Sequence, residues 1–364
     1  MAFWASNIIY KNSYIANLFM KIKKKINTAR RSLMRRLTQN IGKSYGDPKY
    51  NKDLKIHRIL ISRPNHRLGN LLLLTPLVQE VMNTFPDSKI DLFVKGGLSP
   101  IIFKNNGNIH RHIQLPKKPF SSLLKYIQGW FQLKFRKYDL AINSNPSSSS
   151  GRLSILATNA TYKFFGEHDE DLHSKYADYN HDGKKTIYNL RKFLKELGHP
   201  ENTSKIPALQ IKLNQEELET GKANLQKIVQ NDKKTICLFT NATGAKCYSE
   251  EWWHAFYEKL ENAFPDYNIV ELLPVENISK LNFKIPHFYS TDIREMGGFL
   301  ANCAAFVAAD NGVMHLASAV NTPTIGLFSV TDPVAYGPYN DRSFSIDTNK
   351  TDFETIVDQI KAIL

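Results

Sequence analysis

From residue 57 to the end of the chain, short apolar runs alternate with amphipathic segments, and this alternation constrains the fold more than any other feature. Apolar runs bounded by turn residues predict buried strands, and the segments between them predict helices. Strands that alternate with helices form parallel sheets covered by helices. The predicted strands are residues 58–63, 89–95, 138–144, 162–166, 235–241, 268–274, 305–310 and 324–329.

Helices are predicted over residues 68–85, 184–197, 214–232, 249–264, 292–303, 312–320 and 352–364. The polar segment 214–232 separates two series of strands, and 364 residues exceed what one hydrophobic core usually holds. The sequence therefore predicts two doubly wound α/β domains that face each other across a cleft. We expect a basic N-terminal extension over residues 1–55, a first domain over 56–215, a second over 216–345, and a C-terminal helix over 346–364.

The net charge of +14 is concentrated at the N-terminus. Residues 1–56 hold 13 lysines and arginines against two aspartates, a net charge of +11, so the other 308 residues carry +3. A nucleic-acid-binding fold spreads its basic residues over the folded body, so no nucleic-acid partner is expected. The three cysteines are widely spaced and form no C-x-x-C pair, which fits a reducing compartment and excludes a disulfide framework.

Apolar residues of the extension recur at steps of three and four, on one face of a helix whose other faces are largely basic. They are Ile15, Leu18, Phe19, Ile22, Ile26, Ala29, Leu33 and Leu37. A basic amphipathic helix lies in the headgroup region of an anionic bilayer, so residues 14–40 are expected to contact a membrane surface. A helix packed on the protein's own body and a solvated basic tail are the alternatives. The pattern fits neither a spanning helix nor a signal peptide.

Ligands of doubly wound sheets bind beyond the carboxyl ends of the strands, and three strand–helix junctions there carry candidate chemistry. The first junction, residues 63–70, contains Gly69, where the absent side chain allows close approach of a ligand. It lacks the G-x-G-x-x-G spacing of dinucleotide sites, and an ordinary turn is the alternative.

The second junction combines Asn241, Thr243, Gly244 and Lys246 after an apolar strand. Backbone N–H groups and the hydroxyl of Thr243 can donate to a diphosphate, and Lys246 supplies a positive charge. The segment is not a Walker A sequence, and a solvated loop is the alternative.

The third junction contains Asp310, Asn311, Gly312 and His315. A carboxylate at Asp310 can hold sugar hydroxyls, while a helix beginning at Gly312 offers its positive end to a phosphate. The alternative is structural, with Asp310 capping the helix and His315 semi-buried.

In order and spacing, these three junctions resemble the bacterial glycosyltransferase family 9, the heptosyltransferases of lipopolysaccharide core assembly. The resemblance spans about residues 57–345 and is strongest in the segment that begins at Asp310. It also rests on Thr75-Pro76, Pro86-Asp87, Trp252-Trp253, Thr322-Pro323, Asp332-Pro333 and Gly337-Pro338.

The resemblance implies a GT-B enzyme that transfers heptose, or a related sugar, with inversion from ADP-heptose or a similar ADP-sugar to a lipopolysaccharide-core or other lipid-linked saccharide. It implies neither a metal nor a cofactor, because the ADP-sugar is a substrate. The enzyme is expected in the cytoplasm, peripheral on the inner face of the bacterial inner membrane. The implied donor contacts are Asn241, Thr243, Gly244, Lys246, Asp310, Asn311, Gly312 and His315, with Glu276 at the ribose and Thr291 near adenine. The implied acceptor contacts are Gly69, Asn145 and Arg152.

Asn70 departs from the family pattern, which places an aspartate, the expected base, after the glycine. An amide cannot abstract a proton near neutral pH, so Asn70 can only orient the acceptor hydroxyl. His66 lies in the same loop and has an unperturbed pKa near neutrality, which makes it the candidate base. The alternative function is a catalytically impaired homologue that binds a sugar nucleotide or saccharide.

Overall fold

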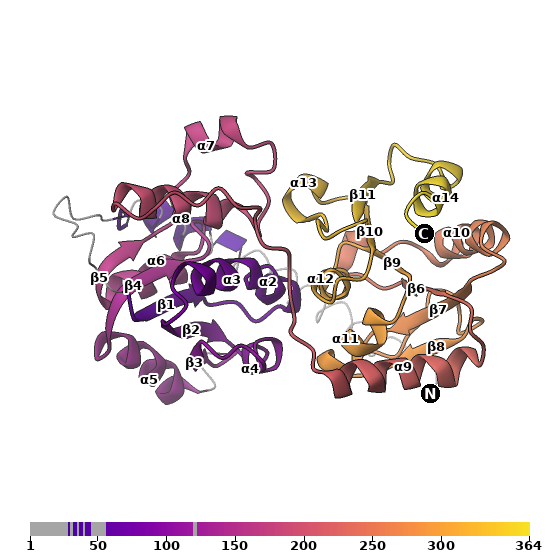
Figure 1. Cartoon of the computed structure of the whole chain (residues 1–364), viewed down its shortest axis with the longest axis horizontal. Coiled ribbons are helices and arrows are strands. Elements are labelled where there is room, and N and C mark those ends of the chain that lie inside the picture. Colours follow the sequence, from indigo (N-terminus) through magenta and orange to yellow (C-terminus); the bar gives the residue numbers. More distant parts are fainter. Residues whose placement is uncertain (1–27, 30–31, 35, 39–40, 45–55, 119–121) are drawn as a thin grey trace, which may run out of the picture.

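The computed structural model describes residues 28–29, 32–34, 36–38, 41–44, 56–118 and 122–364. It contains two parallel sheets, each covered by helices, that lie side by side in Figure 1. The alternation of strands and helices therefore produces the predicted α/β architecture. The first sheet has the order β3-β2-β1-β4-β5, and the second has the order β11-β10-β9-β6-β7-β8.

The first domain contains the strands β1 (Arg58–Arg63), β2 (Lys89–Lys95), β3 (Ile109–Leu115), β4 (Lys137–Asn143) and β5 (Asn159–Phe164). Its helices are α2 (Leu68–Leu72), α3 (Thr75–Thr84), α4 (Ser99–Ile102), α5 (Leu123–Lys134), α6 (Ser149–Ala157), α7 (Glu170–Lys175) and α8 (Lys185–Glu196). The central strand β1 is apolar on both faces, and Ile59, Leu60 and Ile61 are fully buried between the helical layers.

The second domain begins with α9 (Gln215–Val229) and contains β6 (Thr235–Phe239), β7 (Asn268–Leu273), β8 (His287–Tyr289), β9 (Ala305–Ala309), β10 (Thr324–Phe328) and β11 (Phe344–Asp347). The short 3-10 helix η2 (Gly244–Lys246) follows β6. The remaining helices are α10 (Glu250–Ala263), α11 (Ile293–Ala301), α12 (Gly312–Ala319), α13 (Pro333–Tyr336) and α14 (Phe353–Lys361). β11 spans residue 345, the expected domain boundary, and α14 packs on α10.

Several features differ from the sequence prediction, which also lacked the edge strands β8 and β11 and the helices α4, α5, α6, α7 and α13. The single helix predicted over residues 68–85 is divided into α2 and α3, because Pro76 stands in the first turn of α3 and cannot donate to the turn before it. The edge strand β3 was not predicted, since its polar and charged side chains interrupt the apolar run and remain partly exposed.

The described end of the N-terminal extension packs on the first domain. The hydroxyl of Thr38 donates to Ser149 at the start of α6. Arg152 donates to the carbonyl oxygens of Ile41 and Gly42 at 2.9 and 2.6 Å, and the hydroxyl of Ser44 bonds to Glu167. This part of the extension thus follows the alternative of packing on the protein's own body. Most of the predicted membrane helix, residues 14–40, lies outside the described residues.

None of the helices in the described part of the chain is both long and apolar enough to cross a bilayer. The described helical residues 32–34 and 36–38 nevertheless leave Leu33, Met34 and Leu37 exposed.

Two glycines allow α9 to lie against α11 at the base of the second domain. A Cβ atom added at Gly221 would lie 2.1 Å from the carbonyl carbon and oxygen of Gly298. Backbone atoms cannot rotate away as a side chain can, so a larger residue here must separate the two helices.

We predict that Gly221→Ala lowers the free energy of unfolding by about 1–3 kcal/mol, the usual cost of an overpacked contact. Urea unfolding followed by circular dichroism measures the change. Gly107→Ala is the matched control, because a Cβ atom at Gly107 meets no atom within 4 Å. Equal stability of the two variants would contradict the close helix contact.

Candidate active site

The second and third junctions meet at the carboxyl edge of the second sheet. β6 and β9 are neighbouring parallel strands, so the loops that follow them start side by side. The side-chain amide of Asn311 donates to the carbonyl oxygen of Asn241 at 3.2 Å. The ammonium of Lys246 lies 3.0 Å from Oδ2 of Asp310. The structure therefore brings these two loops together.

Asp310 is the centre of this arrangement. Its Oδ2 accepts hydrogen bonds from Lys246 and from the hydroxyl of Thr331, the latter at 2.7 Å. Its Oδ1 lies 4.0 Å from Nε2 of His315, which is too far for a hydrogen bond. Asp310 does not cap α12, because Asn311 does so by accepting from the N–H groups of Val313 and Met314. One carboxylate oxygen is thus available to a ligand hydroxyl.

His315 is buried at the first turn of α12, and burial lowers its pKa to about 4. The nearby positive charge of Lys246 lowers this pKa further, while the carboxylates of Asp310 and Asp182 oppose the shift. The ring is therefore neutral near pH 7.

Thr243, before η2, and Gly244, its first residue, are exposed, whereas Lys246 is partly buried. Gly244 has φ of +67°, a conformation that residues with a Cβ atom adopt at a cost. Since a Cβ atom at Gly244 would meet nothing within 4 Å, the backbone angle and not the space favours glycine.

At the carboxyl edge of the first sheet, one arginine connects the first junction to a distant loop. The buried Arg63 donates from the same nitrogen to Oδ1 of Asn70 at 2.8 Å and to Oδ2 of Asp182 at 2.7 Å. Sequence reasoning missed Arg63 and Asp182. Arg63 could have been predicted, because it is a charged residue at the end of an apolar strand. No sequence pattern indicates Asp182.

The two edges meet through glycines of α2 and α12. A Cβ atom at Gly69 would lie 2.8 Å from Cδ2 of His315, and a Cβ atom at Gly312 would lie 3.3 Å from the backbone nitrogen of Gly69. The contact places the Asn70 helix of one domain directly against the His315 helix of the other. Asp182 also donates its backbone N–H to Ala335 of α13 at 3.0 Å, so a second cross-domain contact flanks the first.

His66 lies on another flank of the first junction. Its side chain is exposed, and Gly96 packs near its Cβ atom. Partial burial and the positive charges of Lys95, Lys117 and Arg67 lower its pKa. The ring is therefore neutral at pH 7, and its role as a base remains a prediction.

The residues expected at the ribose and adenine lie at the same edge of the second sheet. Glu276 follows β7, Thr291 follows β8, and both are exposed. The hydroxyl of Tyr289 donates to the carbonyl oxygen of Val275 and joins the two loops. The buried acid of this region is Glu271, which accepts from Thr240 and Ser279 and whose pKa is raised by burial.

The three residues expected at the acceptor make different contacts in the structure. Gly69 lies at the domain contact, and Asn145 follows β4, where its side chain accepts from the N–H of Ser147. Arg152 is buried against Phe165, and two of its nitrogens donate to the extension. Its observed role is to hold residues 41–44. It also lines a cavity of about 270 Å³ together with Thr38, Pro146, Ser147, Ser149, Glu167, His168 and Lys185.

Within the described residues, the ligand atoms of His168, Glu170 and His173 lie within 4.8 Å of one another, an arrangement that could hold a metal ion. All three side chains are exposed; Glu170 and His173 belong to α7, and His168 precedes it.

Comparison with known proteins supports the family resemblance. The family model described as "Glycosyltransferase family 9 (heptosyltransferase)" matches residues 128–355. Lipopolysaccharide heptosyltransferase 3 of Escherichia coli is 24% identical over 302 residues, which cover 75% of this chain and 84% of that protein. Lipooligosaccharide heptosyltransferase 2 of Haemophilus influenzae is 42% identical over 53 residues, or 15% of each chain.

Solved structures share the two-domain fold. The glycosyl transferase family 9 protein from Veillonella parvula aligns with a TM-score of 0.64 at 16% identity, over 85% of this chain and 91% of that one. The E. coli heptosyltransferase WaaC with ADP aligns with a TM-score of 0.59 at 17% identity, over 84% and 100% of the two chains. At these identities the likeness shows the fold, which is GT-B-like.

The neutral, buried state of His315 predicts a pH dependence of stability. Its pKa is about 4 when folded and 6.5 when unfolded, so between these values only the unfolded chain takes up the proton. Stability is therefore lost as the pH falls below 6.5. We expect His315→Gln to reduce the stability difference between pH 7.5 and pH 5.0 by about 2 kcal/mol, measured by urea unfolding. If the variant shows the same stability difference as the wild type, His315 is protonated in the folded protein at pH 5.0, and the prediction is wrong.

Proposed function

Since the chain belongs to glycosyltransferase family 9 and is a glycosyltransferase, we propose that it transfers heptose, or a related sugar, from an ADP-sugar to a lipopolysaccharide-core or other lipid-linked saccharide. The observation that carries the proposal is the contact of Lys246 with Asp310 at the edge that faces Asn70. The relatives named as heptosyltransferases and the ADP in the WaaC structure support the donor assignment.

On this proposal the donor binds at the edge of the second sheet. Lys246 turns from Asp310 toward the diphosphate and offsets the charge that develops as ADP leaves. The first amides of α12 are already used by Asn311, so a phosphate near Gly312 meets the partial positive charge of the helix end. Thr243 and the amides near Gly244 donate to the same group, while Glu276 and Thr291 contact the nucleoside.

Asp310 holds hydroxyls of the transferred sugar through Oδ1, which accepts no hydrogen bond from a described residue. The neutral ring of His315 packs beside it and excludes water from this side of the sugar. Because charge on the leaving group is met by Lys246, Thr243 and the helix end, we propose transfer without a metal or a cofactor.

Inverting transfer is one displacement: the acceptor oxygen bonds to the anomeric carbon as the bond to the ADP oxygen breaks, and a base takes the hydroxyl proton. Asn70 orients the acceptor hydroxyl, since its amide is not basic. We assign the proton to Asp182, a carboxylate that shares the same Arg63 nitrogen with Asn70. His66 is the alternative base, and its exposed position beside Lys95 and Lys117 favours it less.

A lipid-linked acceptor places the enzyme at a membrane. We propose that it works on the cytoplasmic face of the inner membrane, with residues 14–40 contributing basic and apolar side chains. The exposed side chains of Leu33, Met34 and Leu37 in the described part of this segment support the assignment. A catalytically impaired binding protein is not proposed, because the donor-side residues are retained.

The donor assignment predicts that 1 mM ADP raises the melting temperature, and that Lys246→Ala reduces this shift to less than half. Differential scanning fluorimetry measures both. Lys259→Ala is the matched control, because Lys259 forms an exposed pair with Glu354 on α10 and α14. No shift with wild-type protein, or an equal shift in the Lys246 variant, would contradict the assignment.

The base assignment predicts that Asp182→Asn lowers kcat by at least 100-fold with a KM within threefold, while His66→Ala changes kcat less than threefold. Release of ADP from ADP-heptose with a truncated lipopolysaccharide acceptor measures the rates. Asn70→Asp is expected to raise kcat by supplying a second carboxylate.

An unchanged ADP-dependent melting shift verifies that each of these variants is folded. Loss of turnover in the His66 variant, with turnover kept in the Asp182 variant, would assign the proton to His66 instead.

A further inference from the structure

The outer face of α5 is apolar and exposed. Leu123, Leu124, Ile127, Phe131 and Phe135 recur at helical spacing and have exposed fractions of 55, 78, 40, 53 and 79%. The opposite face is anchored, since Leu133 is buried and Tyr126 and Trp130 pack against the core. We call these five residues the α5 patch. Its most exposed members, Leu124 and Phe135, lie at opposite ends of the helix.

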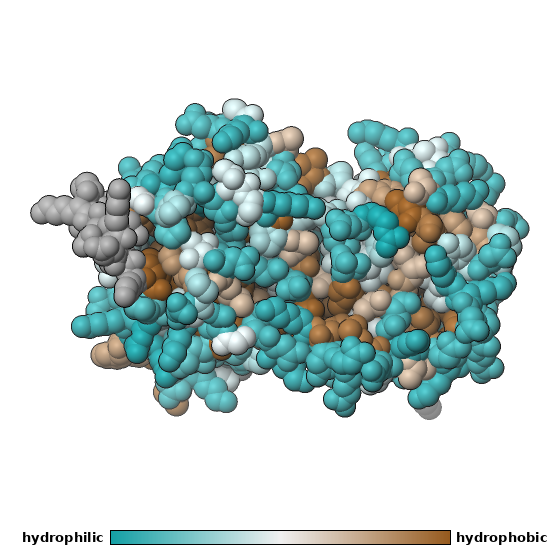
Figure 2. Space-filling model, viewed as in Figure 1, coloured by the Kyte–Doolittle hydropathy of each residue, from teal (hydrophilic) through white to brown (hydrophobic). Residues whose placement is uncertain are grey.

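Soluble proteins rarely expose a continuous apolar stripe of this length, and no described residue covers it. Phe131 and Phe135 stack on each other with ring centroids 6.0 Å apart, and they line a shallow hollow with Gln128, Gln132 and Arg136. In Figure 2, tan and brown atoms lie along the lower left margin, where Figure 1 draws α5.

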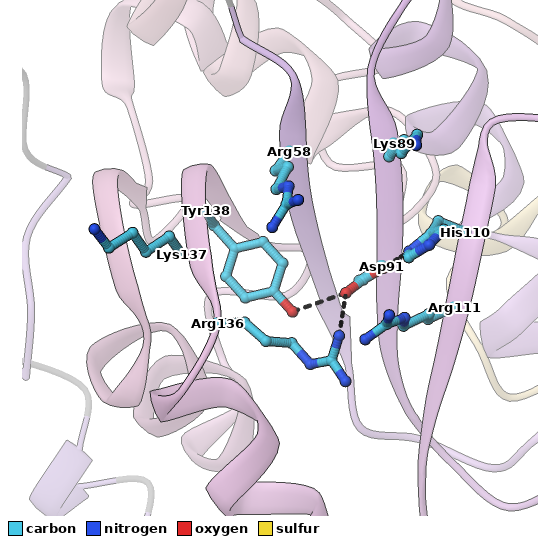
Figure 3. A pocket seen from close by; sticks show the side chains of 8 residues that line it. All are labelled: Arg58, Lys89, Asp91, His110, Arg111, Arg136, Lys137 and Tyr138. Atoms are coloured by element: carbon cyan, nitrogen blue, oxygen red, sulfur yellow. Dashed lines mark hydrogen bonds and ion pairs between the residues drawn. The ribbon is translucent and has the colours of Figure 1, made fainter.

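A basic pocket of about 160 Å³ adjoins the C-terminal end of α5, at the amino edge of the first sheet. It is lined by Arg58, Lys89, Asp91, His110, Arg111, Arg136, Lys137 and Tyr138. Figure 3 shows the guanidiniums of Arg58, Arg111 and Arg136 gathered around Asp91 and Tyr138, while Lys137 extends outward. Arg136 lines both the pocket and the hollow of the α5 patch.

The pocket has more positive charge than its own carboxylate balances. Asp91 accepts from Tyr138 at 3.0 Å and from His110 at 3.2 Å, and it lies 3.9 Å from Arg136. Burial and the carboxylate of Asp91 raise the pKa of Tyr138, so its hydroxyl stays a neutral donor. The side chains of Arg58, Lys89, Arg111 and Lys137 form no hydrogen bond or ion pair with another described residue. Such a cavity favours an anion with several oxygens, as a phosphate has.

The sequence around the two features is one-sided in charge. Residues 92–138 contain nine lysines and arginines and no aspartate or glutamate. A protein partner would need a complementary surface of matching shape, whereas apolar side chains bordered by cations on one helix suit the interface of an anionic bilayer.

We propose that the α5 patch and the basic pocket together dock this protein onto an anionic phospholipid bilayer. The apolar side chains enter the acyl boundary, and the pocket holds a lipid phosphate. The packed end of the extension reaches the neighbouring helix, since α5 contacts α6 and Thr38 bonds to Ser149 at the start of α6. This inference goes beyond the proposed transfer reaction and does not depend on it.

The test uses the full chain and sedimentation with vesicles of phosphatidylcholine containing 25% phosphatidylglycerol, or of phosphatidylcholine alone. Leu124→Ser/Phe131→Ser/Phe135→Ser is expected to lower the apparent association constant for the anionic vesicles at least tenfold. Arg58→Gln/Arg111→Gln is expected to do the same, without changing the weaker binding to neutral vesicles. Both variants should keep the wild-type melting temperature, because the replaced side chains are exposed.

Lys222→Gln/Lys227→Gln removes two exposed charges from α9 and is the matched control, with Phe283→Ser for the apolar change. Wild-type binding by the α5 variant, or an equal loss in the controls, would overturn the proposal. So would a dimer in lipid-free solution that the α5 variant converts to a monomer, because the patch would then be a protein interface. Deletion of residues 1–31 measures how much of the vesicle binding depends on the extension. The proposal requires that the shortened protein still binds anionic vesicles and that the α5 substitutions reduce this binding.

The ADP-dependent melting shift separates the two proposals. A variant that loses vesicle binding and keeps the ADP shift supports docking through α5 independently of donor binding. If ADP binds to none of the proteins while the vesicle results hold, the donor assignment fails and the docking surface stands.

Discussion

The close contact of α2 with α12 is the constraint on which the candidate site depends. Each sheet carries polar groups at its own carboxyl edge, and neither edge alone brings an acceptor group to a donor group. Gly69 and Gly312 let the two helix starts approach until a Cβ atom would touch His315 or the neighbouring backbone. The cross-domain hydrogen bond of His181 to Gly337, at 2.8 Å, keeps the edges in register. A glycine in each domain thus brings two ordinary strand–helix junctions together into one candidate site.

The charged groups at this candidate site are held at a cost to stability. Burying Arg63 with Asp182, or Asp310 with Lys246, removes hydration that the ion pairs only partly restore. The Nε atom of Arg63 is buried and has no hydrogen-bond partner among the described residues. An unpaired buried donor costs about 1–3 kcal/mol, so folding alone does not account for an arginine here. The cost is explained if Arg63 serves a substrate. A substrate oxygen would then accept a hydrogen bond from the guanidinium, or be positioned by Asn70 and Asp182, which Arg63 holds.

Much of the fold could be read from the sequence, because buried parallel strands are continuous apolar runs. β1, β6, β9 and β10 satisfy this rule, and their carboxyl ends located Asp310 and the loop of Lys246 correctly. This rule did not predict the edge strand β3 or the helix α5, because only one face of each is buried. Asp182 was missed because its place beside Asn70 depends on a chain reversal between α7 and α8. Arg152 was placed at the acceptor by the family resemblance, whereas in the structure two of its nitrogens donate to Ile41 and Gly42.

The net charge of the folded body did not show where its basic residues gather. A total of +3 beyond residue 56 conceals an acid-free stretch from 92 to 138, and the fold concentrates it further by bringing Arg58 and Lys89 to the same edge. The direction of α5 relates this basic region to the candidate site. The helix connects the carboxyl end of β3 to the amino end of β4. Leu123 and Leu124 therefore lie toward the carboxyl edge of the sheet, and Phe135 lies toward the basic pocket at the amino edge. A bilayer lying along α5 would therefore reach from the pocket to the side of the domain where Asn70 and Asp182 stand. On the proposed function, a lipid-linked saccharide would then reach Asn70 and Asp182 while its lipid remains in the membrane.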